Sequence, residues 1–236
     1  MMFPARSSAQ EIMDDMSIED GRIDRALDEL RVINRWLGGH RTSRLGIERI
    51  ARTIPAGRPI SILDVGAGAA DLDEALVRLG RSCVVISLDL NAEACRYVRR
   101  RKPTANVVNG SALALPFKGR SFDIVHASHV LHHFSDPDAT RLIAHLAATA
   151  RYGLVINDLR RHAFAYAAIR ALTHLFSRSE MVRHDGPTSV LRAFHRNEIY
   201  SLLSSVSHGH IVLSRRWAFR WCAAVTFDSY DDPVAG

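Results

Sequence analysis

A glycine-rich corner at residues 63–71 constrains the fold of this chain more than any other feature. It follows the apolar run 60–63, which has the length of a buried strand, and it precedes residues 72–77, which have the pattern of a helix. Gly66 and Gly68 lack a Cβ atom, so the backbone can turn sharply there and come close to a ligand. A strand, a glycine-rich turn and a helix in this order predict the nucleotide-binding corner of an α/β domain.

Asp64 favours one kind of nucleotide-binding corner over another. The pattern G-x-G-x-A by itself is also similar to the fingerprint of dinucleotide-binding dehydrogenases. A carboxylate two residues before the first glycine would repel a pyrophosphate, but it suits a ligand that bears an ammonium group. With Asp64, the corner resembles the first motif of the class I S-adenosylmethionine-dependent methyltransferases, whose strand ends in D-x-G-x-G.

Two further segments follow in the order that this resemblance requires. Residues 84–89 have the pattern of a second buried strand, and the acid at its end, Asp89, lies 23 positions after Gly66. This is about the spacing at which an acid meets ribose hydroxyls in nucleotide-binding α/β folds. Residues 107–117 resemble the family's adenine-contacting segment G-D-A-x-x-L-P-F, although Ser111 stands where the family usually has Asp.

A fourth motif covers residues 121–134 and matches the family's F-D-x-V strand followed by L-H-H. Strand and helix patterns alternate around it, which predicts a doubly wound, mostly parallel sheet with helices on both faces. The resemblance implies a Rossmann-like α/β methyltransferase fold with seven strands, the last two in a C-terminal β-hairpin. The predicted strands cover residues 60–64, 83–89, 105–108, 122–126, 152–157, 211–217 and 221–227.

The chain carries helices before this core. Residues 23–37 and 42–53 have apolar residues at helical spacing, whereas residues 1 to about 20 have the pattern of a flexible segment. We therefore expect an N-terminal helical extension or lid over residues 1–55. The methyltransferase core is expected over residues 56–236.

Within the core, a substrate-side helical insertion is predicted at about residues 160–195. Its first part, residues 163–176, has a helical pattern with Phe164 and Phe176 on one side. Three interpretations stay open for this helix: packing on the core, a lid over an apolar or aromatic substrate, or a helix on a membrane surface. Residues 183–194 have the pattern of a polar loop followed by the start of a helix, which is a reasonable place for substrate contacts.

The resemblance implies a role for each residue of the cofactor motifs. Asp64 is expected to act on the ammonium group of S-adenosylmethionine, partly through water, and Asp89 to accept both ribose hydroxyls. The other implied contacts are the backbone of Gly66, Ala67 and Gly68 beside the amino-acid part, Leu90 and Ala112 on the two faces of adenine, Ser111 at its edge, and His126 and Ala127 at the methionine portion.

Histidines at positions 126, 129, 132 and 133 offer candidates for a general base. His129 occupies a place where the family usually carries an apolar residue, and a histidine there could deprotonate a phenol near neutral pH. His132 and Asp158 are the alternatives, and a mechanism without a dedicated base stays open. His133 is expected to be structural, because L-H-H occurs in methyltransferases of varied chemistry. No carboxylate cluster adjoins these histidines in the sequence, so no metal site is predicted.

The residues after the fourth predicted strand narrow the acceptor. Residues 125–129 do not form the D/N-P-P-Y motif of enzymes that methylate exocyclic amines in DNA, RNA or protein glutamine. We therefore expect a small organic acceptor, foremost a phenolic or quinone-like oxygen, as in the similar methyltransferases of bacterial polyketide and quinone pathways. Carbon methylation of a similar aromatic acceptor, a non-catalytic binding protein and a dehydrogenase are the alternatives, and Asp64 argues against the last.

Charge and cysteine content exclude other classes of function. The net charge of +6 is nearly all arginine, and the one dense basic run, residues 99–102, lacks the interleaved aromatic residues of a base-stacking surface. Nucleic-acid binding is therefore not expected. No apolar run approaches the roughly 20 residues of a membrane span, and no secretory signal is evident. Three cysteines without metal or redox spacing are typical of a cytoplasmic protein. A homo-oligomer stays open.

Overall fold

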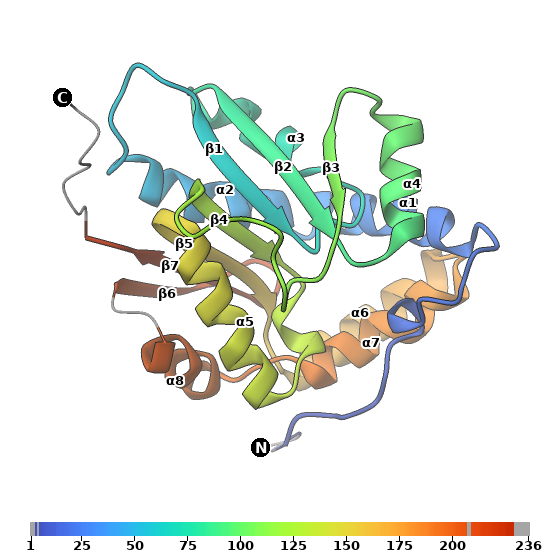
Figure 1. Ribbon diagram of the computed structural model, residues 1–236. Helices are drawn as coiled ribbons and strands as arrows, with labels where there is room; N and C mark the ends of the chain where they lie inside the picture. The colour runs from blue at the N-terminus through green and yellow to red at the C-terminus, as the bar shows by residue number, and fades with distance from the viewer. Residues whose placement is uncertain (1–2, 4, 207–208, 229–236) are drawn as a thin grey trace.

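A seven-stranded sheet forms the centre of the computed structural model, which describes residues 3, 5–206 and 209–228 (Figure 1). Its strand order is β3-β2-β1-β4-β5-β7-β6, and the first five strands in the chain run parallel. The antiparallel hairpin of β6 and β7 closes the sheet beside β5. The strands are β1 (Ile60–Val65), β2 (Cys83–Asp89), β3 (Asn106–Asn109), β4 (Phe122–Ser128), β5 (Ala150–Leu159), β6 (His210–Arg216) and β7 (Arg220–Thr226).

Helices cover both faces of the sheet, so its central strands are apolar on both sides. Figure 1 shows α5 (Asp136–Thr149) in front of the sheet and α2 (Gly39–Ala51) behind it. On the side of α2, Ile47 and Ile50 pack with α3 (Leu72–Leu76) and with apolar residues of β1 and β4. On the other side, α5 packs with α8 (Arg196–Val206) against the sheet. This architecture confirms the predicted doubly wound fold and its C-terminal hairpin.

A third apolar cluster joins the beginning of the chain to the glycine corner. It contains Ile23 and Leu27 of α1 (Arg22–Trp36), Ala70 of the corner and Met181 of α7 (Glu180–Arg192), and it includes residues of α4 (Ala92–Arg101). The predicted N-terminal helices are confirmed as α1 and α2. The short 3-10 helix η1 (Ile12–Asp14) precedes them, and η2 (Val77–Leu79) and η3 (Leu131–His133) follow α3 and β4.

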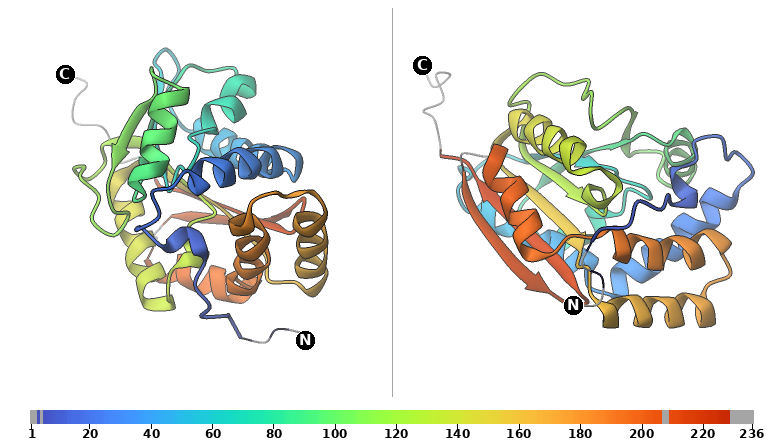
Figure 2. Two further views of the ribbon diagram at one scale, coloured as in Figure 1. Left: turned by 90° about the vertical axis from the view of Figure 1, so that its right-hand side faces the viewer. Right: turned by 90° about the horizontal axis from the view of Figure 1, so that it is seen from below.

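Residues 5–20, called the N-terminal segment below, pack against the body of the protein, contrary to the flexible segment expected from the sequence. Figure 2 shows this segment crossing beside α7. The carboxylate of Asp185 in α7 accepts hydrogen bonds from the backbone amides of Ile12 and Met13, at 2.7 and 3.0 Å. Because these bonds come from a residue far along the chain, nothing in the local pattern of residues 5–20 reveals them.

Residues 183–194 lie mostly in the helix α7, where the sequence pattern predicted a polar loop. The helix begins at Ser179, whose side chain caps the amide of Val182, and it contains Gly186 and Pro187, which usually mark turns. Buried residues lie on several sides of α7, so the helix lacks the single polar face from which an amphipathic pattern is recognised. Tertiary packing outweighs the turn residues here.

The helix α6 (Ala163–Phe176) lies beside α7 and leaves most of its large apolar side chains outside the core (Figure 2). Ala165 and Thr173 are buried, whereas Phe164 and Phe176 are 65% and 77% exposed. Phe164 and Phe176 therefore lie outside the buried side of α6, although the helix itself packs beside α7. A lid or a surface helix remains compatible with this exposure.

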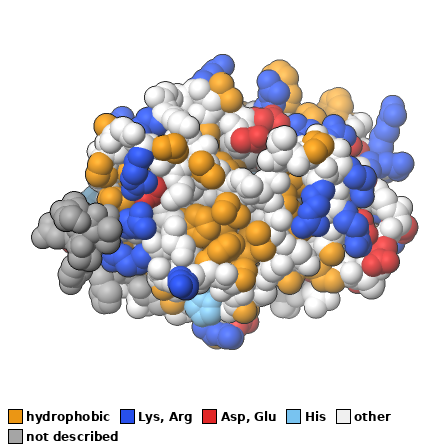
Figure 3. Space-filling view, turned by 45° about the horizontal axis from the view of Figure 1, so that its top comes forward, with side chains coloured by type: hydrophobic (Ala, Val, Ile, Leu, Met, Phe, Trp, Pro, Cys, Tyr) orange, Lys and Arg blue, Asp and Glu red, His pale blue; other side chains and the backbone are white. Residues whose placement is uncertain are grey.

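The surface carries both kinds of charge. On the face in Figure 3, lysine and arginine side chains are spread around a central apolar patch, and acidic side chains lie among them. Cys83, Cys95 and Cys222 are free thiols. Within the described residues, none of the helices combines the length and the hydropathy that a membrane crossing needs.

Candidate active site

The glycine corner connects β1 to α3 at the carboxyl edge of the sheet. Gly66 and Gly68 have φ angles of 64° and 51°, in the left-handed region that favours glycine. A Cβ atom on Gly66 would lie 2.3 Å from Cγ2 of Val130, so no other residue fits there without a shift of the segment after β4. The turn therefore requires glycine for two reasons, its backbone angle and its close contact.

Asp89 is held against this corner by backbone amides. Its Oδ2 accepts a hydrogen bond from the amide of Gly68 at 2.7 Å, and its Oδ1 accepts one from the amide of Asn91 at 2.8 Å. Burial raises the pKa of Asp89, and these two hydrogen bonds offset only part of that effect. Among the described residues, no cationic side chain donates a hydrogen bond to Asp89.

The other predicted cofactor contacts lie near the same edge of the sheet and differ in how exposed their side chains are. Leu90 directly follows β2 and is 55% exposed, so its apolar side chain is available to a ligand. The Ser111 hydroxyl accepts a hydrogen bond from the amide of Leu113 at 3.2 Å, and Ala112 packs against the core. Ala127 in β4 is buried.

Asp64 and His126 contact each other across neighbouring strands. The register of β1 and β4 pairs the two residues, and Asp64 Oδ1 lies 2.7 Å from His126 Nδ1. His126 Nε2 lies 2.8 Å from the hydroxyl of Ser43 in α2, which also accepts a hydrogen bond from Asn157 at 2.9 Å. All four side chains are buried. Sequence reasoning missed Ser43 and Asn157, because only the fold brings α2 and β5 to this point.

A second group of side chains, called the histidine cluster below, lies at the carboxyl ends of β4 and β5. His132 Nδ1 is 2.6 Å from Asp158 Oδ1, and the other oxygen of Asp158 accepts the His132 backbone amide at 3.1 Å. His133 Nδ1 is 2.8 Å from Asp14 of the N-terminal segment. The cluster consists of Glu11, Asp14, His132, His133 and Asp158.

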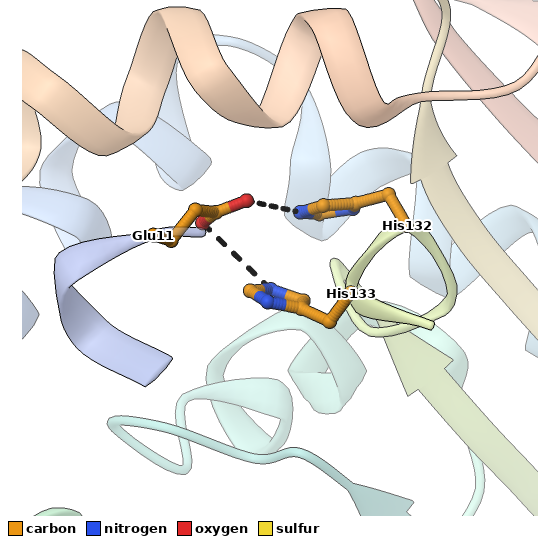
Figure 4. A group of neighbouring side chains, drawn as sticks. All are labelled: Glu11, His132 and His133. Carbon is orange, nitrogen blue, oxygen red and sulfur yellow. Dashed lines mark ion pairs between the residues drawn. The ribbon is translucent and has the colours of Figure 1, made fainter. Parts of the chain in front are cut away.

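Glu11 extends from the N-terminal segment over the two histidines (Figure 4). Its Oε1 lies 3.5 Å from His132 Nε2, and its Oε2 lies 3.9 Å from His133 Nε2. Arg192 of α7 binds the same region, since it donates hydrogen bonds to Asp14 and to the carbonyl oxygens of both histidines. The sequence shows no carboxylate cluster beside these histidines, but the fold brings Glu11 and Asp14 to them. Asp14 lies 119 residues before His133 in the chain.

Comparison with known proteins identifies the domain that contains the glycine corner. Residues 62–153 match the family described as "Methyltransferase domain". This part of the chain is therefore similar to methyltransferase domains. A demethylmenaquinone methyltransferase of Renibacterium salmoninarum is 32% identical over 97 residues, which are 41% of this chain and 38% of that protein. A demethylmenaquinone methyltransferase of Chlorobaculum tepidum is 30% identical over 101 residues, which cover 39% of this chain and 41% of that protein. The match spans about two fifths of these curated relatives.

Solved structures share the fold of this chain over most of its length. The plantazolicin methyltransferase, solved with S-adenosylhomocysteine, has a TM-score of 0.62 and 13% identity, and covers 91% of this chain and 98% of its own. Human N-acetylserotonin methyltransferase, solved with S-adenosylmethionine, also has a TM-score of 0.62. It is 15% identical, and the match covers 93% of this chain and 59% of its own. These two structures contain the cofactor that the motifs imply, or its demethylated product.

The charges of the histidine cluster oppose a role of His132 as a general base. Burial alone lowers the pKa of His132, but Asp158 and Glu11 outweigh burial and raise it to about 10. Burial raises the pKa of Asp158 and of Glu11, yet the adjacent His132 holds both below their ordinary values. Without a further cation, His132 is therefore an imidazolium between two carboxylates and does not accept a proton near neutral pH.

His129, the favoured base of the sequence prediction, lies outside the cluster and contacts Arg220 of β7. Its φ angle is 57°, and its Nε2 faces the Arg220 guanidinium. Burial, followed by the charge of Arg220, holds the pKa of His129 well below its ordinary value. The imidazole is thus neutral, but the guanidinium occupies the nitrogen that would take a proton.

Proposed function

We propose that this protein transfers the methyl group of S-adenosylmethionine to a small organic acceptor, foremost an oxygen of a phenolic or quinone-like metabolite. The observation that carries the proposal is the corner formed by Gly66, Gly68 and Asp89 inside a matched methyltransferase domain. The names of the two curated relatives support a quinone-type acceptor, since both are demethylmenaquinone methyltransferases.

The residues of the corner fit this cofactor. Gly66 and Gly68 give the turn its left-handed backbone angles, Asp89 offers carboxylate oxygens at the end of β2, and Leu90 offers an exposed apolar side chain. When bound, the cofactor supplies an electrophilic methyl group, so the chain has to place an acceptor oxygen in line with it and handle its proton. The remaining proposed contacts are those of Asp64, Ala67, Gly68, Ser111, Ala112, His126 and Ala127.

On the acceptor side, we assign the contact with the oxygen to the pair of His132 and Asp158 in preference to His129. Asp158 fixes Nδ1 of His132, and Nε2 of His132 is buried without a hydrogen-bond partner. A positive charge at this place stabilises negative charge on an acceptor oxygen. His129 is assigned a structural role, because Arg220 already binds its Nε2.

The N-terminal segment, α1, α6 and α7 form the proposed cover of the acceptor. Leu27 of α1 and Met181 of α7 pack in one cluster with Ala70 of the glycine corner, so these helices adjoin the cofactor motifs. The exposed side chains of Phe164 and Phe176 on α6 suit an apolar or aromatic ligand. Residues 1–55 and about 160–195 thus act as a lid in this proposal.

Calorimetric titration with S-adenosylhomocysteine, with NAD in a parallel cell, tests the cofactor. We expect a Kd of about 1 μM for the first ligand and no binding of the second. Asp89→Ala should weaken binding by at least about tenfold, because it removes the proposed ribose acceptor. Asp20→Asn, an exposed acid on the N-terminal segment, is the matched control. Binding of NAD alone, or of neither ligand, would overturn the proposal.

A panel of phenols and quinols with labelled S-adenosylmethionine tests the acceptor. Mass spectrometric fragmentation of the product distinguishes an O-methyl from a C-methyl group, so it separates the proposal from carbon methylation. Binding of S-adenosylhomocysteine without transfer to any member of the panel would favour a non-catalytic binding protein. That result would leave the assignment of the glycine corner in place and overturn the proposed turnover.

A further inference from the structure

Three side chains of the histidine cluster direct ligand atoms toward one point beneath the N-terminal segment. The ligand atoms of Glu11, His132 and His133 all lie within 4.8 Å of one another (Figure 4). Glu11 and His132 are buried, and Glu11 Oε1 and His132 Nε2 have no hydrogen-bond partner. Their separation of 3.5 Å suits an ion pair but leaves both buried atoms without a hydrogen bond.

The opposite nitrogen of each imidazole is fixed by a carboxylate. His132 Nδ1 lies 2.6 Å from Asp158, and His133 Nδ1 lies 2.8 Å from Asp14. When the histidines are neutral, each Nδ1 donates its hydrogen to that carboxylate, and the lone pair of each Nε2 is directed toward Glu11. A histidine held by a carboxylate in this way is the usual arrangement around a metal-binding imidazole.

We propose that Glu11, His132 and His133 bind a divalent first-row transition metal ion, foremost Zn²⁺. Two imidazole nitrogens and one carboxylate form a donor set that zinc accepts, with a fourth position left for water or another oxygen ligand. Metal–ligand distances of about 2.0–2.2 Å place neighbouring ligand atoms of a tetrahedron about 3.4 Å apart. The separation of 3.5 Å between Glu11 Oε1 and His132 Nε2 is close to that value, and one ligand atom from each of the three residues lies within 4.8 Å of the other two.

The charges around the three ligands match a divalent cation. With neutral histidines, the carboxylates of Glu11, Asp14 and Asp158 and the guanidinium of Arg192 together carry a net charge of −2. Arg192 lies 3.9 Å from Glu11 Oε1, but its hydrogen bonds go to Asp14 and to backbone carbonyl oxygens. The guanidinium therefore braces the cluster without occupying the point between the ligands.

The alternative is a metal-free cluster in which protons on the histidines balance the carboxylates. Both arrangements use the same side chains. They are distinguished by whether protein that has been freed of metal by a chelator binds a metal ion at this place. Metal binding does not depend on methyl transfer, and it is measured without any acceptor. In the proposed arrangement the ion joins the N-terminal segment to the ends of β4 and β5, so it also stabilises the contact of that segment.

Titration of the chelator-treated full-length protein with ZnCl₂ in a calorimeter tests the proposal. We expect one ion per chain, with a Kd of about 1 μM or below, and a higher Tm with zinc. Glu11→Gln and His133→Gln should each weaken binding by at least about tenfold. Asp15→Asn, on the same segment, and His174→Gln, on the surface of α6, are the controls and should bind like the wild type.

Folding and cofactor binding are followed in the same samples. His132 is fully buried against Asp158, so its replacement can prevent folding, and Glu11→Gln is the decisive variant. Circular dichroism and S-adenosylhomocysteine binding should be unchanged in Glu11→Gln, which separates loss of the metal from failure of the proposed function. No stoichiometric zinc binding, or equal binding by Glu11→Gln and the wild type, would overturn the proposal in favour of the metal-free cluster.

Discussion

The glycine corner and the histidine cluster lie after neighbouring strands of one sheet, yet they are built in opposite ways. The corner depends on backbone conformation: Gly66 and Gly68 take left-handed φ angles, and backbone amides hold Asp89. The cluster depends on side-chain charges that come from three distant parts of the chain. The corner is therefore tied to the core strands, whereas the cluster is tied to the position of the N-terminal segment.

The largest effect is expected in the cluster, from Asp158→Asn. The variant leaves the buried His132 without its ionic partner, and the unfolding free energy should fall by about 3 kcal/mol or more. Asp136→Asn, which removes a partner of Arg6 that is 71% exposed, should cost less than about 1 kcal/mol. Urea denaturation measures both. Equal effects of the two variants would show that the buried pair is not the stronger one.

The corner should respond to Gly66→Ala through strain and collision together. A left-handed residue other than glycine costs about 1 kcal/mol or more, and here the new Cβ would also meet Val130 at 2.3 Å. Gly80→Ala is the matched control, because Gly80 has a φ of 72° and nothing within 4 Å of its Cβ position. We expect both to lose stability, but only Gly66→Ala to lose binding of S-adenosylhomocysteine, by about tenfold or more. Equal affinities would remove the corner from the proposed site.

Most of the corner could be predicted from the sequence, because its parts are close together in the chain and each carries a local signal. Gly66, Gly68 and Asp89 belong to one β-α-β unit, and their spacing alone places them at one edge. For the cluster, the sequence indicated His132, His133 and Asp158 but not the two acids that join them. Glu11 and Asp14 lie in a segment whose pattern indicated flexibility, and the hydrogen bonds to Asp185 that hold it come from α7. The helix α7 is buried on several sides, and the sequence pattern predicted mainly a polar loop there. Its contacts with the N-terminal segment could therefore not be anticipated.

Asp89 and Asp123 should contribute oppositely to the pH dependence of the unfolding free energy, because Asp123 is paired with Arg58 whereas backbone amides hold Asp89. Burial raises the pKa of Asp89. It also tends to raise the pKa of Asp123, but hydrogen bonds from Arg58 and Ser61 hold that pKa below its ordinary value. Asp123 therefore contributes stability above the unfolded pKa of about 3.9 that is lost as the pH falls, and Asp89 contributes with the opposite sign.

Urea denaturation from pH 7 to below pH 3 measures this contrast. Asp123→Asn should make the loss of stability on acidification shallower than in the wild type, because the paired carboxylate is gone. Asp89→Asn should make the loss steeper, because the group that favours the folded state on protonation is gone. Parallel curves for the two variants would contradict the assigned directions of the pKa shifts.

A smaller and local effect is expected from Asp185→Asn, which weakens the anchor of the N-terminal segment. The carboxylate accepts two backbone amides, and its loss should destabilise the segment by about 1–3 kcal/mol. Hydrogen exchange of residues 5–20 should accelerate, while exchange in β1 and β4 stays slow. Zinc affinity should fall in the same variant, because Glu11 is then held less often over the histidines. Unchanged exchange in residues 5–20 would show that other contacts fix the segment.

The smallest effect on stability is expected from Phe164→Ser on α6, and its effect on catalysis decides between two interpretations of that helix. Phe164 is 65% exposed, so the unfolding free energy should change by less than about 0.5 kcal/mol. If α6 covers the acceptor, the KM for a phenolic acceptor should rise while the affinity for S-adenosylhomocysteine stays constant, because only the acceptor side is altered. Tyr200→Ser, on an exposed site of α8, is the control and should change neither quantity. An unchanged KM in Phe164→Ser would mean that the exposed aromatic side chains of α6 face something other than the acceptor.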